Sequence, residues 1–459
     1  MKVKRKVLLS LGLILVASMV MSACGTSTPT PSAPTATSPP VDTAAPAATS
    51  APVDTSAPTA LPERVEIKIV DWAAEGVNSW NDRWYKAFEE SHPNIKLVHE
   101  QVPADRYIET ILTRISGAND IDIIISAPAY TGNFLRSGVA LELTPYIEKD
   151  ADILQLDQFV QWTLEDYTEI RYPELDEPGQ YGLPLVIFVW EFWFNTDMLT
   201  EAGLSTPQRG WTWDDFATIC EKVTDPANKL FGYQHANWLL PLWPWVWQNG
   251  GEVLTSDGSQ LAIGSEAAVE AFSFLQKLQV EDNVFAPPGQ GYFFAEVGYD
   301  SGNAAMVTRG NWAKDLSPNW AFQWDVSYPP TGKIEATMGE QVGLIINKTS
   351  PKIDAAWEVL SWLMSPEGQE VNALQDIVPN TEVMREFGLQ AAPDNVRNIV
   401  VPLSSDPMVR SYPVWYRPNY TPDDLLAELA LLWTGEAQAS ELLPALEEEF
   451  NEALSQPLP

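Results

Sequence analysis

The stretch LPLWPWVWQNGG, residues 240–251, sets three tryptophans at alternate positions: Trp243, Trp245 and Trp247. In a strand the three indoles would share one side, but the prolines among them predict an irregular loop instead. The rings either fill a dense core or offer flat faces to a ligand, and the stretch by itself leaves both readings open.

The ligand chemistry that suits such rings is that of a sugar. The C–H face of a pyranose packs on an aromatic ring, while its hydroxyls need fixed carboxylates, amides or guanidinium groups. A site built for hydroxyls also rejects ligands without them, because its own polar groups would be left unpaired. The chain holds 19 tryptophans, more than helix and sheet packing ordinarily requires, which favours this chemistry.

Further candidates follow the ends of predicted strands. Trp72 ends the first strand, Glu75 lies in the loop after it, and Tyr130 follows a later strand within SAPAYTG, residues 126–132. Open α/β sheets bind ligands at the carboxyl ends of their strands, so we expect these three side chains at one edge. Each has the alternative of packing into the core.

The elements that would position them alternate between strand and helix. Residues 64–72, 94–102 and 121–127 read as strands, and the last is apolar throughout, as in a parallel sheet covered on both faces. Residues 79–93 and 104–115 have helical periodicity. Later helices are predicted in 266–278, 352–364, 366–377 and after Thr421, with a strand in 338–350. The order indicates an α/β fold.

The amino terminus reads as an export signal. A basic region precedes the apolar run 7–21, which is too short to favour a membrane span, and Ser22-Ala23-Cys24 follows. This ending resembles the lipobox of bacterial lipoproteins, with Met21 where leucine is usual. We therefore expect cleavage after residue 23, acylation of Cys24 and a membrane anchor, with ordinary secretion as the alternative. Residues 24–62, rich in Pro, Thr, Ser and Ala, predict a semi-extended spacer.

Composition excludes several classes of protein. A net charge of −35 repels nucleic acid. The chain has 2 cysteines and 3 histidines. With Cys24 reserved for lipid, no disulfide is expected, and Cys220 fits a buried helical face. No hydrolase elbow, zinc-protease or phosphate-loop motif appears, so we expect no enzyme, no cofactor and no metal.

Several segments together resemble the extracellular solute-binding proteins of ABC importers, in the sugar-binding group (family 1) that includes maltose-binding protein. In chain order they are YGLPLVIFVWEFWFNTDML (181–199), GWTWDDFATIC (210–220), the NGG-to-QKL block (249–278), SGNAAMVTRGNW (301–312), AAWEVLSWLMSPEGQ (355–369) and the Val-Pro pair at 378–379. The resemblance runs from about residue 63 to the end.

The resemblance implies a type II periplasmic-binding-protein fold, with two α/β lobes joined by several crossings. It divides the chain into an N-terminal lobe of residues 63–185 and 329–377 and a C-terminal lobe of residues 186–328 and 378–459. The loop 126–132 lacks the charged side chains of maltose-binding protein, which argues against a maltose-like specificity.

The resemblance also implies where the ligand lies. The GNW segment carries the family's ligand-stacking tryptophan, the residues before the double glycine face the ligand, and a late aromatic segment joins them. Strand alternation further sets Phe188 and Trp190 on one side and Glu191 on the other. The expected ligand contacts are therefore Trp72, Glu75, Tyr130, Phe188, Trp190, Trp245, Asn249, Gly310, Trp312, Glu340, Trp415 and Arg417.

The resulting expectation is a monomeric substrate-binding lipoprotein of an ABC importer, at the cell surface or in the periplasm. It would hold a mono- or oligosaccharide between the lobes and deliver it to the permease subunits. Two alternatives remain. Tryptophans with carboxylates also bind polyamines or quaternary ammonium ions, and 62 acidic residues leave room for the carboxylate pair of a glycoside hydrolase.

Overall fold

The computed structural model describes residues 64–73, 82–172, 175, 177–235, 238–287, 296–414 and 422–455. Its strands are β1 Val65–Ala73, β2 Ile95–Pro103, β3 Ile123–Ser126, β4 Leu183–Asn195, β5 Phe231–Gln234, β6 Ala304–Gly310, β7 Trp324–Ser327, β8 Thr337–Ile346 and β9 Val409–Ser411.

The helices divide into those before and after β6. The earlier ones are α1 Asp82–Ser91, α2 Tyr107–Ser116, α3 Pro128–Arg136, α4 Thr144–Lys149, α5 Ala151–Leu154, α6 Gln161–Glu165, α7 Thr196–Glu201, α8 Trp213–Val223, α9 Trp243–Gln248 and α10 Glu266–Gln276. The later ones are the short 3-10 helix η5 Asn311–Asp315, then α11 Ile353–Met364, α12 Pro366–Ala373, α13 Thr381–Phe387, α14 Asp394–Leu403, α15 Pro422–Trp433 and α16 Ala439–Leu454.

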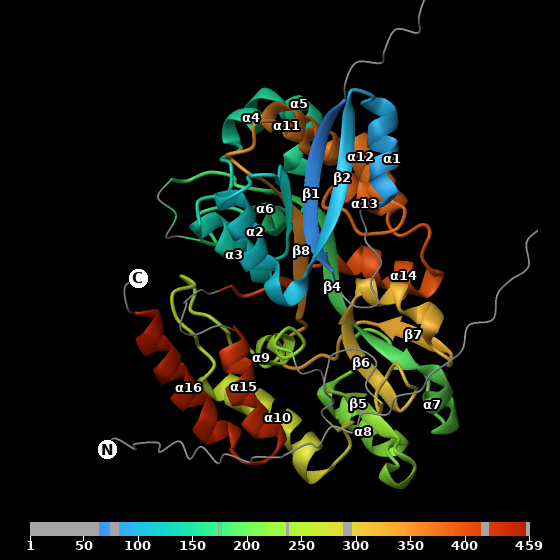
Figure 1. Ribbon diagram of the computed structural model, residues 1–459. Helices are drawn as coiled ribbons and strands as arrows, with labels where there is room; N and C mark the ends of the chain where they lie inside the picture. The colour runs from blue at the N-terminus through green and yellow to red at the C-terminus, as the bar shows by residue number, and fades with distance from the viewer. Residues whose placement is uncertain are drawn as a thin grey trace, which may run out of the picture. The chain divides into compact units, whose positions relative to one another are not determined.

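The first part of the sheet is covered by helices on both faces. β1 pairs in parallel with β2 and β3, and β3 pairs antiparallel with β8. Ile123 and Ile125 pack with residues of α1 and α11, whereas Ile124 packs with residues of α2 and α3. Figure 1 shows α1 and α12 on one side of these strands and α2 and α3 on the other. This confirms the prediction that residues 121–127 contain a strand with helices packed on both faces of the sheet.

Strand β4 connects the two parts of the sheet. From Leu183 to Val189 it pairs with β8, and from Trp190 to Phe194 it pairs with β6. The strand order is β2-β1-β3-β8-β4-β6-β5, with β7 paired to β4 and β9 paired to β8. All 13 residues of β4 are buried, which suits a strand covered along its whole length.

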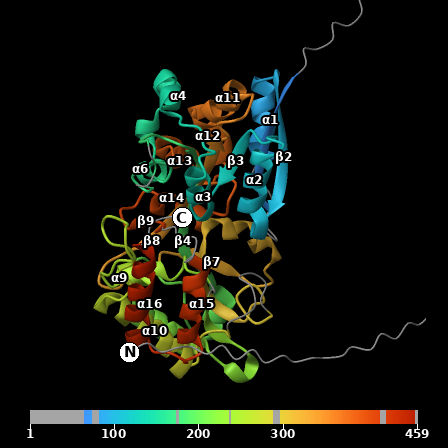
Figure 2. The same ribbon diagram turned by 60° about the vertical axis from the view of Figure 1, so that its left-hand side comes forward.

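The second part of the sheet packs against the helices of the carboxyl-terminal region. A large apolar cluster joins β4 and β5 to α8, α9, α10, α15 and α16. Figure 2 shows α15 and α16 side by side with α10 next to them. Cys220 is fully buried in this cluster, so its predicted core position is confirmed.

Most of the predicted helices and strands are present. Thr212 and Asp215 form a reciprocal capping box at the start of α8, and Ser365 caps α12 with a proline at its first position. The loop predicted at residues 240–251 is wrong: Trp243–Gln248 form helix α9. Pro244 lies in its first turn, where a missing N–H costs no intrahelical hydrogen bond.

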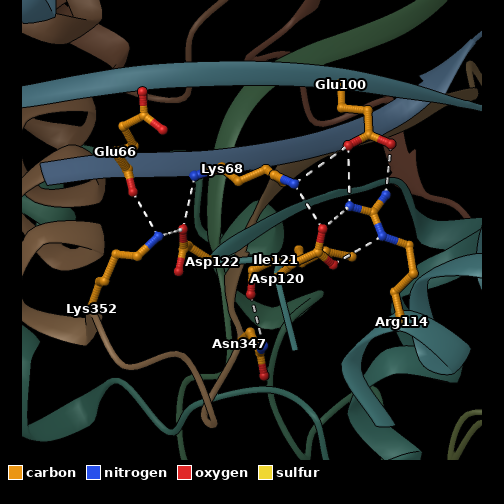
Figure 3. Close-up of polar contacts among 9 residues, drawn as sticks. All are labelled: Glu66, Lys68, Glu100, Arg114, Asp120, Ile121, Asp122, Asn347 and Lys352. Carbon is orange, nitrogen blue, oxygen red and sulfur yellow. Dashed lines mark hydrogen bonds and ion pairs between the residues drawn. The ribbon is translucent and has the colours of Figure 1, made fainter. Parts of the chain in front are cut away.

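A charged network ties the loop before β3 to its neighbours (Figure 3). Arg114 donates to Glu100 and Asp120, and Lys68 Nζ donates to Asp120 Oδ2 at 2.7 Å. Nearby, Asp122 accepts from Lys352 Nζ at 2.8 Å and from the Lys68 backbone N–H at 2.8 Å. The network therefore locks β1 to the segments on either side of it.

Candidate functional site

The predicted residues of β4 and β8 lie where the two parts of the sheet meet. Phe188 is opposite Glu340 in the β4–β8 pair, and Trp190 is opposite Gly310 in the β4–β6 pair. Phe188, Trp190 and Glu340 therefore share one face of the crossing strands, because paired residues and alternate residues point the same way. Glu191 turns to the other face, toward Trp193 and Lys314.

Trp312 lies directly after β6, in η5. Its partly buried side chain packs against three separate apolar clusters, which places it where they converge. A Cβ at Gly310 would lie 2.6 Å from Nε1 of Trp312, so the absence of a side chain at Gly310 makes room for the indole. The neighbouring Asn311 accepts a hydrogen bond from the Val189 backbone N–H at 2.9 Å and ties η5 to β4.

Two further indoles lie beside Trp190. Its ring centroid lies 6.2 Å from that of Trp312 and 5.4 Å from that of Trp238, both in edge-to-face geometry. Trp190 is fully buried, whereas Trp312 and Trp238 are partly exposed. Trp238 was not among the predicted contacts. The tryptophan-rich composition of its segment pointed to the region but could not single out this ring.

Glu340 adds an acidic group beside these rings. Burial raises the pKa of Glu340 to about 7. The nearby indole N–H of Trp190 opposes that rise, although it lies outside ordinary hydrogen-bond geometry. Within the part of the chain that the structure describes, Glu340 forms no ion pair. It is a carboxyl group that can accept or donate hydrogen bonds near neutral pH.

A second aromatic group lies at the carboxyl ends of β1 and β3. Trp72 is 5.2 Å from Tyr130 and 5.9 Å from Tyr107 between ring centroids. The Tyr107 hydroxyl lies 2.9 Å from Val70 O and 2.7 Å from Ile125 O, within hydrogen-bond distance of both strand ends. Trp72, Tyr130 and Trp312 all pack against the same apolar cluster. The structure thus brings Trp72 and Tyr130 to one edge, as expected.

Trp245 and Asn249 have internal roles. Trp245 is 2% exposed and its ring lies within 5.2 Å of those of Trp213 and Phe216. The Asn249 amide donates to Ala267 O at 2.7 Å and to Glu270 Oε2 at 2.9 Å. Both residues belong to the packing of α9 against α8 and α10, apart from the group around Trp190.

Four of the predicted residues, Cys24, Glu75, Trp415 and Arg417, lie outside the described residues, as do the signal and spacer segments. Among the helices that are described, none combines the length and the apolar character needed to cross a membrane. No group of His, Cys, Asp and Glu in the described ranges is arranged to hold a metal ion.

Comparison with known proteins identifies the family. The profile of the family "Bacterial extracellular solute-binding protein" matches residues 73–370, more than half of the chain. A putative binding protein of Brucella abortus is 26% identical over 61% of this chain and 67% of its own length. The galactooligosaccharide-binding protein of Bacillus subtilis is 23% identical over 68% of this chain and 74% of its own length.

Solved structures share the fold. An ABC substrate-binding protein of Listeria monocytogenes, in complex with cycloalternan, superposes with a TM-score of 0.74 at 24% identity, over 86% of this chain and 100% of that one. The maltose-bound MalE3 of T. maritima gives a TM-score of 0.68 at 19% identity, over 84% of this chain and 99% of its own. The expected two-lobed α/β fold is confirmed, and the chain belongs to the bacterial extracellular solute-binding proteins.

Proposed function

We propose that the protein captures a carbohydrate between its two lobes and delivers it to the membrane subunits of an ABC importer. The single observation that carries this proposal is the gathering of the partly exposed indoles of Trp238 and Trp312 around the fully buried Trp190, beside Glu340, at the junction of β4, β6 and β8. Indole faces suit the C–H faces of sugars, and the carboxyl group suits their hydroxyls. The names of relatives that bind galactooligosaccharides and cycloalternan support the same class of ligand.

The proposed contacts fall into two groups, one in each predicted lobe. Trp72, Glu75 and Tyr130 belong to the N-terminal lobe of residues 63–185 and 329–377. Trp190, Trp238 and Trp312 belong to the C-terminal lobe of residues 186–328 and 378–459. By the same bounds Glu340 belongs to the first group, and Trp415 and Arg417 belong to the second. A ligand that touches both groups stabilises a closed form, which is the form the permease would recognise.

The location that we propose is the outer face of a membrane. Acylation of Cys24 after cleavage of residues 1–23 would anchor the chain, and residues 24–62 would hold the folded part away from the lipid. Metabolic labelling with a fatty-acid analogue tests this: the wild-type chain should carry label, and a Cys24→Ala variant should carry none.

The binding proposal is tested by calorimetry with neutral mono- and oligosaccharides. We expect saturable binding of at least one sugar, together with a more compact scattering profile in its presence. A panel in which no sugar binds, or in which a tight ligand leaves the scattering profile unchanged, would contradict the proposal.

A cationic solute is the second candidate. Glu340 has no ion-pair partner within the described residues and lies beside an indole, an arrangement that also attracts quaternary ammonium or polyamine ions. Choline, betaine and spermidine therefore belong in the same panel. Binding of one of these without any response to sugars would replace the carbohydrate proposal.

A further inference from the structure

A cavity of about 580 Å³ lies at the edge of the sheet where β9 pairs with β8. Its walls come from three stretches that are distant in sequence: residues 165–171, 247–258 and 410–414. The described residues of the proposed sugar contacts do not line it. The volume is within the roughly 300–1,000 Å³ typical of small-molecule sites.

Two guanidinium groups in the cavity are held in fixed orientations. Arg410 lies over the Trp247 ring, 5.1 Å from its centroid, and donates to Glu252 Oε1 at 2.9 Å. Nε of Arg171 lies 3.1 Å from Asp166 Oδ1, and the same guanidinium group donates to Ser411 Oγ at 3.1 Å. Donors that are already oriented lose little conformational freedom when a ligand accepts their remaining hydrogen bonds.

The charges in the cavity select against anions. Arg410 is paired with Glu252 and Arg171 with Asp166, while Glu165 and Asp257 add two further acidic side chains to the walls. Thr255, Ser256 and Ser411 contribute hydroxyl groups, and Ile170, which is 64% exposed, contributes apolar surface. Fixed donors, acceptors and apolar area together suit a neutral polyhydroxylated ligand.

One wall residue of the cavity, Arg410, lies on the same face of the sheet as the proposed sugar contacts. Met338 is opposite Arg410 in the β8–β9 pair, and Glu340 is two residues further along β8. Arg410 and Glu340 therefore share a face, with Cα atoms on the order of 8 Å apart from strand spacing and rise alone. The same face carries Phe188 and Trp190 on β4. Glu340 thus lies between the indole group and the cavity.

We infer that this cavity binds the outer units of an oligosaccharide whose inner unit lies against Trp312 and Glu340. The inference rests on the proposed function and makes it more specific: the ligand is an oligosaccharide rather than a monosaccharide. Arg410 and Arg171 donate to the hydroxyls of the outer units, and Glu165 and Asp257 accept from them.

Calorimetry on sugars of increasing length tests the inference. The probes are glucose, galactose and their α- and β-linked homo-oligomers of two to five units, titrated into the wild-type protein and two variants. Arg410→Ala removes a donor, and Ser256→Trp fills the cavity from an exposed position without deleting any contact of the fold. Arg209→Ala is the matched control, since Arg209 also lies over an aromatic ring, Tyr328, and pairs with Glu335, yet does not line the cavity.

The wild-type protein should bind the best long sugar at least about tenfold more tightly than its monosaccharide. Both cavity variants should lose most of that gain while the affinity for the monosaccharide stays the same, and Arg209→Ala should behave as wild type. Melting temperatures establish that each variant folds. If Arg410→Ala does not fold, Ser256→Trp alone still tests the cavity.

Two results would contradict the binding of outer sugar units in the cavity and leave the proposed carbohydrate binding itself unaffected. One is a wild-type affinity that does not increase with length, and the other is a loss in the cavity variants that is equal for short and long sugars. A wild-type protein that binds no sugar of any length overturns the proposed function, and the inference with it.

Discussion

Two polar regions on the same sheet are built in opposite ways. Around the amino end of β3, the side chains of Lys68, Arg114 and Lys352 each meet a carboxylate within 2.8 Å (Figure 3). At the junction of β4 and β8, the carboxyl group of Glu340 meets an indole and no cation among the described residues. One region satisfies its charges internally, and the other holds a carboxyl group that forms no ion pair within the described residues.

The difference follows from what burial costs. A charge that leaves water must be paired and hydrogen-bonded, and the first region meets that requirement, so we assign it to stability. A partly buried carboxyl group that meets no counter-charge holds its proton to higher pH instead, and Glu340 meets none among the described residues. Such a group is found where a ligand supplies the missing partner. Variants in the two regions should therefore separate stability from binding.

The largest effect is expected for Trp312→Ala. The substitution removes the ring at which three apolar clusters converge, and truncating such a ring costs about 2–4 kcal/mol of binding free energy. Calorimetry with the best sugar of the panel should therefore show an affinity at least about thirtyfold weaker. Trp324→Ala is the control: Trp324 is also a partly buried indole, packed on Trp193, and its loss should lower the melting temperature but not the affinity. Equal losses of affinity in both variants would remove Trp312 from the site.

The charged network should show the reverse behaviour. Asp122 accepts hydrogen bonds from Lys352, from the Ser350 hydroxyl at 2.6 Å and from the Lys68 backbone. Asp122→Ala leaves these donors unpaired and should lower the free energy of unfolding by about 2–3 kcal/mol, less than for a fully buried pair because the Lys352 side chain is 35% exposed.

Urea denaturation measures that loss, and sugar affinity should remain at the wild-type value. Asp105→Ala, at a 79% exposed side chain, should change neither quantity. A large loss of affinity in Asp122→Ala without a loss of stability would show that the network belongs to the binding site.

Gly310→Ala tests the position of the Trp312 ring without removing the ring. The backbone of Gly310 has φ near −72°, which any residue adopts, so the substitution brings no backbone strain. Its new Cβ meets Nε1 of Trp312 at 2.6 Å and must displace the ring. We expect sugar affinity to fall about tenfold with little change in melting temperature. An unchanged affinity would mean that the position of this indole does not matter for binding.

How far the sequence predicts these regions depends on whether a feature is local. Ser365-Pro366 marks a helix start by itself, and the apolar run 121–127 marks a buried strand by itself, and both are confirmed. The prolines of residues 240–251 predict a loop where the structure has helix α9, because a proline such as Pro244 in the first turn of a helix breaks no intrahelical hydrogen bond. Local pattern therefore gives the fold class and most of the elements.

The site depends on contacts between distant segments, which no local pattern contains. The role of Trp238 rests on its packing against Trp190, 48 positions earlier in the chain, and the burial of Trp245 rests on rings from α8 and α10. Phe188, Trp190 and Glu340 could be proposed in advance, because strand alternation and the family resemblance together specify a face. No local pattern predicts the charged network, since its partners come from five separate segments: β1, β2, α2, the loop before β3 and the residue before α11.

The smallest effect is expected for Glu340→Gln, and it distinguishes the two candidate ligand classes. The pKa of Glu340 in the folded protein is about 7, above its ordinary value of 4.5. The folded state thus binds the proton more tightly than the unfolded state, so the contribution of this group to stability is complete below pH 4.5 and is lost as the pH rises to 7. The Gln variant should lack this decline when melting temperatures are compared between pH 5 and pH 8.

The affinity for ligand, measured across the same pH range, distinguishes a neutral sugar from a cationic ligand. A neutral sugar accepts hydrogen bonds from the protonated carboxyl and donates to the ionised one, so its affinity for the wild-type protein should vary by no more than about threefold between pH 6 and pH 8. A cation needs the ionised form alone, and its affinity would rise about tenfold per pH unit below 7 and level off above it. A steep rise that disappears in Glu340→Gln would identify the aromatic group as a cation site, whereas a flat profile in both proteins leaves Glu340 as a hydrogen-bonding partner of a neutral ligand.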